Sequence, residues 1–172
     1  MIAGVLDEFF GVPTHPLAVH APVVLVPLLA VVAVVLAARP SWRQRVSWFM
    51  PLVVLSMAVL LWIATESGES AVDASNVFGN IDEHRELGQR TFQLSVVWFV
   101  VAVVSAGVDR MTRAPAAQAD AMVQGEQPAV AAAKVPASAG TALAALAAVV
   151  ALVTTVWLVR TGHAGAESRW VL

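Results

Sequence analysis

The chain of 172 residues contains no cysteine, and only 13% of its residues are charged. The absence of cysteine excludes disulfides, thiolate zinc sites, iron–sulfur clusters, covalently attached haem and thiol nucleophiles. An average soluble protein has roughly 25% charged residues, so this composition argues against a water-soluble domain. Ten Lys and Arg against twelve Asp and Glu leave no basic surplus for a phosphate backbone. We therefore expect no nucleic-acid partner, and any metal or cofactor must be held by His, carboxylate, Met or backbone groups.

Long apolar stretches are abundant, since 59% of the residues are hydrophobic. A membrane-spanning helix needs about 20 predominantly apolar residues, and four uncharged stretches come close to or reach this length: about 17–38, 46–64, 92–108 and 139–159. Asn80 and Glu83 form a helix-capping pattern that predicts the third helix to begin near Ile81. We predict an all-α integral membrane protein, a four-transmembrane-helix bundle in the lipid bilayer, with residues 1–172 as one domain.

The basic residues favour one orientation of this bundle. Arg39, Arg43 and Arg45 lie in the first connection, whereas no basic residue precedes the first span. Because cytoplasmic loops carry an excess of Lys and Arg, we predict a multi-pass protein of the bacterial cytoplasmic membrane with both termini extracytoplasmic. Residues 112–138, rich in Ala, Pro and Gln, predict a flexible cytoplasmic linker.

All histidines fall on one side of the predicted membrane. An even number of spans puts the N-terminus, the second connection and the C-terminus on the same side, whichever way the protein inserts. The helix ends on this side carry imidazole or carboxylate side chains: His15, His20, Glu66, Glu69, His84 and His163. The opposite side has no histidine.

Small and polar residues extend from these positions along single helix faces. Steps of four and three from His84 give Gly88, Thr91, Ser95, Trp98, Ala102 and Ser105, and steps back from Gly162 give Leu158, Thr155, Ala151, Ala148 and Ala144. Small residues allow membrane helices to approach closely, so we expect His84 and the Gly162–His163 corner to point into the bundle. Pro16, Pro22 and Pro27 predict a kink that turns His20 inward.

The ends of the second and fourth spans resemble each other. Thr65-Glu-Ser-Gly68 follows the second span, and Thr161-Gly-His163-Ala-Gly165 follows the fourth. A helical hairpin that occurs twice would explain this similarity. Two repeated hairpins are therefore one interpretation of the bundle.

Three segments resemble a known family. Thr14-His-Pro-Leu-Ala-Val-His-Ala-Pro22 resembles the HPxxVHxP opening of bacterial predicted membrane proteins with domain of unknown function 2231. Asp82–Gly88 and Thr161–Gly165 are similar to the family's third-helix histidine segment and its closing TGHxG-type turn. The resemblance covers about residues 14–165, apart from the linker. It implies a four-helix membrane fold with no established activity, and the association of some relatives with cytochrome-type redox modules favours haem.

The first functional hypothesis is a haem- or metal-binding electron-transfer module on the extracytoplasmic side. Imidazoles on facing helices ligate haem iron in bundles, so the candidate ligands are His20, His84 and His163. Glu66 is an additional ligand for a bare divalent metal ion, and His15 and Glu69 support the ligands from beside them. The cofactor is haem b, a divalent metal ion or none.

The second hypothesis is a structural or accessory subunit of a larger membrane complex. In this case the histidines cap helix ends or bond carbonyls that prolines leave free. The sequence has no Gly-flanked Ser nucleophile, HExxH helix or phosphate-binding Gly loop, so we expect no catalysis beyond electron transfer. The partners would be respiratory or cytochrome-type membrane proteins, or a second copy of the chain.

Overall fold

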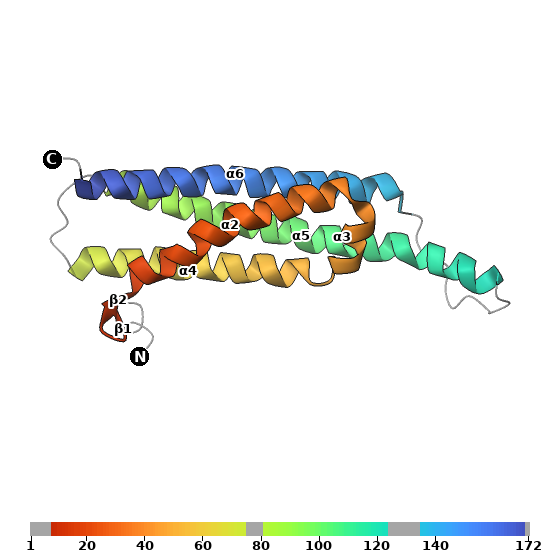
Figure 1. Ribbon diagram of the computed structural model, residues 1–172, viewed down its shortest axis with the longest axis horizontal. Helices are drawn as coiled ribbons and strands as arrows, with labels where there is room; N and C mark the ends of the chain where they lie inside the picture. Colours follow the sequence, from red (N-terminus) through yellow and green to blue (C-terminus); the bar gives the residue numbers. More distant parts are fainter. Residues whose placement is uncertain (1–7, 75–80, 124–134, 171–172) are drawn as a thin grey trace.

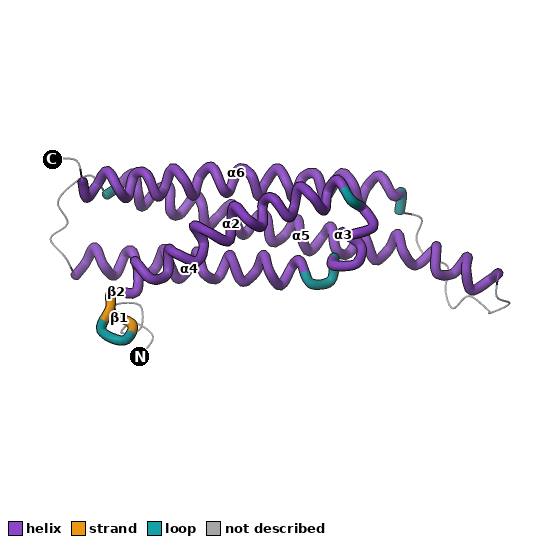
Figure 2. Tube along the Cα trace, in the orientation of Figure 1, coloured by secondary structure: helices purple, strands orange, loops and turns teal. Residues whose placement is uncertain are grey.

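The structure is a computed structural model in which residues 8–74, 81–123 and 135–170 are described (Figure 1). Four long helices form an antiparallel bundle: α2 (Thr14–Ala38), α4 (Met50–Ala74), α5 (Asp82–Val123) and α6 (Ala137–Trp170). The short helix α3 (Pro40–Val46) joins α2 to α4 (Figure 2). Two-residue strands β1 (Glu8–Phe9) and β2 (Val12–Pro13) form a hairpin before α2, with Gly11 at a φ of 76° in its turn.

Each of the four long helices contains a segment that is long and apolar enough to cross a membrane. These segments are Thr14–Ala38, Met50–Ser70, Asp82–Thr112 and Ser138–Glu167. Their lipid-facing surface is apolar, because many Val and Leu side chains, such as Val24 and Val156, are exposed. The prediction of an all-α membrane bundle is confirmed.

The packing order of the helices puts α2 and α5 on one diagonal of the bundle. Helix α2 packs against α4 and α6, and α5 packs against the same two helices. The core between them combines large side chains with alanines: Val26, Ala30, Val54, Leu61, Trp98, Ala102, Ala151 and Leu158. Side chains at the ends of α2 and α5 can therefore face each other across the bundle axis.

The small and polar face predicted for the third span is buried. Thr91, Ser95, Trp98, Ala102 and Ser105 are all buried in the bundle. The hydroxyl groups of Thr91 and Ser95 donate hydrogen bonds to carbonyls of their own helix. Their polarity is thus satisfied within α5, as helices in lipid require.

Helix α5 is longer than the third apolar stretch at both ends. It begins at Asp82, one residue after the predicted start, while Asn80 lies outside the described residues. It continues to Val123 and projects beyond the other helices (Figure 1). The helix therefore includes the first part of the segment whose composition predicts a linker, and residues 124–134 lie outside the described residues.

The two ends of the bundle differ in composition. We call the end where α2 and α5 begin and α4 and α6 terminate the histidine end, because it carries His15, His20, His84 and His163. We call the opposite end the arginine end, because it carries Arg39, Arg43, Arg45 and Arg110. The structure thus gathers all four histidines at one end, as the parity of the spans predicts.

Candidate functional site

Two histidines meet across the bundle at the histidine end. His15 lies in the first turn of α2 and His84 in the first turn of α5. Their ring centroids are 6.1 Å apart, with an angle of 88° between the ring planes. Both side chains are partly buried. The diagonal helices therefore bring one imidazole each to the bundle axis.

Each of these imidazoles is held by a carbonyl on the neighbouring helix. His15 Nδ1 lies 2.8 Å from the carbonyl oxygen of Ala64 on α4. His84 Nδ1 lies 2.8 Å from the carbonyl oxygen of Thr161 on α6. A carbonyl oxygen only accepts, so in each ring Nδ1 carries the hydrogen and donates it. In the neutral tautomer, Nε2 of both rings keeps its lone pair.

A glycine makes room for each ring. A Cβ atom built on Gly68 would lie 3.1 Å from His15 Nδ1 and Cε1, and one built on Gly165 would lie 2.8 Å from His84 Cε1. Each glycine follows the accepting carbonyl by four residues, one turn along the same helix. Glycine is needed here because the imidazole approaches the helix backbone.

The two helical hairpins repeat this arrangement. In both, a histidine in the first turn of the first helix contacts a carbonyl and a glycine near the end of the second helix. Gly68 and Gly165 belong to the similar segments that suggested a duplicated hairpin. The contacts of α2 with α4 are thus equivalent to those of α5 with α6.

A cavity of about 400 Å³ opens beside the two imidazoles. Drug-sized ligands and cofactors occupy pockets of roughly 300–1,000 Å³. Apolar side chains such as Val19, Val23 and Leu158 contribute to the wall, together with the hydroxyl-bearing residues Thr65, Thr91 and Thr161. The cavity is therefore an amphipathic space between α2, α4, α5 and α6, with both histidines in its lining.

His20 and His163 do not join this pair. His20 is exposed, and its Nδ1 donates to the Pro16 carbonyl of its own helix. His163 is also exposed, and its Nε2 lies 3.2 Å from Glu167 Oε1. The structure therefore pairs His84 with His15. The sequence suggested His84 as a ligand but His15 only as a supporting residue.

Helix geometry explains both outward positions. Each residue turns an α-helix by about 100°, so His20, five residues after His15, points to another side of α2. Helix α6 continues to Trp170, so there is no corner at Gly162–His163. Thr161 and Gly165 face His84, and the side chain two residues after Thr161 points away.

The two glutamates at the end of α4 have different surroundings. Glu66 is exposed and does not line the cavity, whereas Glu69 does. Glu69 forms a two-pronged ion pair with Arg85, in which Arg85 Nε donates to Glu69 Oε1 at 2.9 Å. In the part of the chain that the structure describes, no three His, Asp or Glu side chains are placed to hold a metal ion together.

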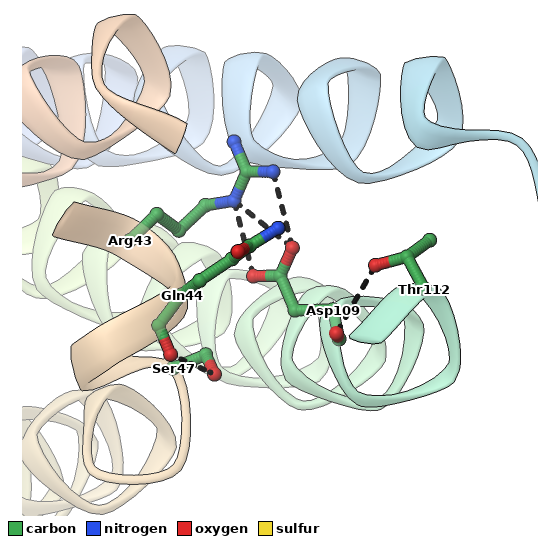
Figure 3. A network of polar contacts seen from close by, with 5 residues as sticks. All are labelled: Arg43, Gln44, Ser47, Asp109 and Thr112. Carbon is green, nitrogen blue, oxygen red and sulfur yellow. Dashed lines mark hydrogen bonds and ion pairs between the residues drawn. The ribbon is translucent and has the colours of Figure 1, made fainter. Parts of the chain in front are cut away.

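The arginine end contains a buried ion pair that the sequence analysis missed. Arg43 of α3 donates from Nε and Nη2 to the carboxylate of Asp109 on α5, at 3.0–3.1 Å (Figure 3). The Asp109 side chain is 1% exposed and that of Arg43 is 7% exposed. Arg43 Nη1 has no hydrogen-bond partner among the described residues. Asp109 lies four residues after Ser105, so one more step along the polar face of α5 would have found it.

Comparison with known families found a family model that matches most of the chain. The model of DUF2231, described as a predicted membrane protein, matches residues 11–172. The chain belongs to the DUF2231 family. The matched region contains all four long helices and both cavity histidines, and the description of DUF2231 states no activity. Comparisons with curated proteins and with solved structures found no match.

Proposed function

We propose that this DUF2231 protein is a membrane electron-transfer module that binds haem b in the cavity at the histidine end. His15 and His84 would be the residues that hold it. The observation that carries the proposal is the pair of imidazoles on diagonal helices, each with Nδ1 bonded to a backbone carbonyl. Metal-ligating histidines almost always donate their other ring N–H to such an acceptor, which fixes the ring and its tautomer.

The number of available ligands favours haem over a bare metal ion. Haem iron takes at most two axial ligands from the protein, whereas zinc sites use three or four protein ligands. Imidazole nitrogens bind metal ions at about 2 Å, so two rings on opposite sides of one ion have centroids roughly 6 Å apart. The spacing of 6.1 Å between His15 and His84 fits this arrangement.

The proposed role follows from two-imidazole ligation. A bound haem would supply a one-electron carrier, and a site in which His15 and His84 both hold it would suit electron transfer rather than oxygen binding. The basic residues of the arginine end support the orientation predicted from the sequence, with the histidine end outside the bacterial cytoplasmic membrane. Respiratory or cytochrome-type membrane proteins would then be the redox partners.

The same hydrogen bonds also favour a second candidate function, a structural subunit of a membrane complex. The contact of His15 with Ala64 joins α2 to α4, and the contact of His84 with Thr161 joins α5 to α6. In this role the imidazoles fasten helix ends and need no ligand. The two functions differ in whether Nε2 of His15 and His84 binds iron.

Histidine-to-asparagine substitutions separate these functions, because an asparagine amide can donate to the same carbonyl but offers no ring nitrogen to iron. The experiment titrates haem into the purified detergent-solubilised protein and follows the Soret band. We expect the wild type to bind haem with a low-spin spectrum. His15→Asn and His84→Asn should each weaken haem binding at least tenfold, and should leave the unfolding temperature nearly unchanged.

The exposed histidines provide matched controls. His20→Asn and His163→Asn should bind haem as tightly as the wild type, since neither side chain lines the cavity. Loss of haem binding in these two variants would instead support the ligand set predicted from the sequence. A wild type that binds no haem and, by elemental analysis, holds no metal would contradict the proposal and favour the structural role.

A further inference from the structure

The cavity at the histidine end carries one ion pair in a mainly uncharged lining. Among the described residues that line it, Glu69 and Arg85 are the charged ones. Their side chains are 35% and 43% exposed, so the pair lies where the cavity meets solvent. Arg85 directly follows His84 along the first turn of α5. A guanidinium group is therefore positioned at the rim of a space whose wall is largely apolar.

We propose that Arg85 recognises a carboxylate on the ligand of this cavity. This inference rests on the proposed function and adds to it the ligand class: an apolar body with an acidic head, as in a haem whose propionates face solvent. Arg binds carboxylates with two parallel hydrogen bonds. It already makes this type of contact with Glu69.

Without a ligand, the Glu69 carboxylate occupies the position on Arg85 that the ligand's carboxylate would take. Ion pairs between solvent-exposed side chains contribute little to stability, so exchange of one carboxylate for another at Arg85 costs little. The ligand's acidic group would then compete with Glu69 for the same guanidinium. Removal of the Glu69 charge should therefore strengthen ligand binding, whereas removal of the Arg85 charge should weaken it.

Arg90 provides a matched control on the same helix. It also forms an exposed ion pair, with Glu86 one turn before it, and it contacts the Trp157 ring. Arg90 does not line the cavity. A general effect of positive charge at the histidine end would involve both arginines, whereas recognition of a ligand at the cavity involves Arg85.

The test compares haem with haem dimethyl ester, which has the same iron and ring but no free carboxylate. Both are titrated into wild type, Arg85→Gln, Glu69→Gln and Arg90→Gln in detergent. We expect Arg85→Gln to bind haem about tenfold more weakly, the loss of one charge-assisted hydrogen-bonded contact. It should bind the ester as the wild type does. Glu69→Gln should bind haem several-fold more tightly, and Arg90→Gln should not differ from the wild type.

The outcomes separate this inference from the proposed function. Suppose that the wild type binds haem, and that Arg85→Gln either weakens the binding of haem and of the ester equally or weakens the binding of neither. Recognition of the carboxylate by Arg85 is then wrong, whereas the proposed haem site is not contradicted. If Arg90→Gln weakens haem binding as much as Arg85→Gln, the effect is general electrostatics and the inference also fails. If the wild type binds neither compound, both proposals fail.

Discussion

The two ends of the bundle differ in how their polar side chains are paired. At the arginine end, the opposite charges of Arg43 and Asp109 are buried and bonded to each other. At the histidine end, two imidazoles each bond a backbone carbonyl, and their rings line a cavity of about 400 Å³. At the arginine end, the charged groups of Arg43 and Asp109 bond mainly to each other. At the histidine end, each imidazole bonds a carbonyl through Nδ1 and keeps Nε2 for a ligand.

The size of the adjoining space supports this contrast. The cavity beside Arg43 and Asp109 has a volume of about 60 Å³, which holds only a few water molecules. A buried ion pair between α3 and α5, with no ligand-sized space beside it, therefore serves the fixed geometry of this end. The larger cavity at the histidine end has the volume of a ligand site. These differences support the proposal that the arginine end has a structural role and the histidine end a binding role.

The largest expected effect is on stability, from breaking the ion pair. Removal of one partner of a buried pair leaves an uncompensated charge and costs about 3–5 kcal/mol. Asp109→Ala should destabilise the protein by roughly this amount, measured by denaturant unfolding in detergent followed by circular dichroism. The Arg43→Met, Asp109→Leu double variant leaves no charge and should be close to the wild type.

The same variants test whether the two ends are independent. The double variant should bind haem with unchanged affinity, because its substitutions lie at the arginine end. A double variant as unstable as Asp109→Ala would show that the pair contributes more than mutual neutralisation. Loss of haem binding in a folded double variant would contradict the division of roles between the ends.

A smaller effect on stability and a clear one on binding are expected from Gly165→Ala. The new Cβ would lie 2.8 Å from His84 Cε1, so the ring must move and its hydrogen bond to Thr161 is weakened. We expect about 1–2 kcal/mol of destabilisation, within the usual range for overpacking, and roughly tenfold weaker haem binding. Unfolding and haem titration measure the two effects.

Gly107→Ala on α5 is the matched control, because Gly107 is a helical glycine that does not line the cavity. No atom lies within 4 Å of a Cβ built at this position. Alanine is favoured over glycine inside a helix by up to about 1 kcal/mol, so this variant should be as stable as the wild type or more stable. Equal haem binding by the two glycine variants would mean that the position of the His84 ring does not matter for the site.

Features set by hydrophobic length and helix period could be predicted from the sequence. Four uncharged stretches predicted four spanning helices, and the parity of the spans placed every histidine at one end. The period of the third span predicted the buried face that includes Thr91, Ser95 and Trp98. These features depend on local pattern, which a single sequence contains.

The pairing of the site residues depended on rotations and distances that the sequence does not contain. Whether His15 or His20 faces the bundle depends on where α2 begins and how it rotates against α4. Gly68 and Gly165 carried a usable signal, because a glycine near a helix end in both hairpins marks a close approach. The ion pair joins Arg43 and Asp109, which are 66 positions apart. The local signs of Asp109 were its charge just beyond the apolar stretch and its place on the polar face of α5, but neither sign indicates Arg43 as its partner.

The most direct test of the account is the response of the reduced haem complex to carbon monoxide. With both His15 and His84 on the iron, no position is open, so the wild-type spectrum should not shift rapidly on mixing with carbon monoxide. The His84→Asn complex should shift rapidly, because one position is then open. A rapid and complete shift of the wild-type spectrum would contradict ligation by the two histidines and the electron-transfer role derived from it.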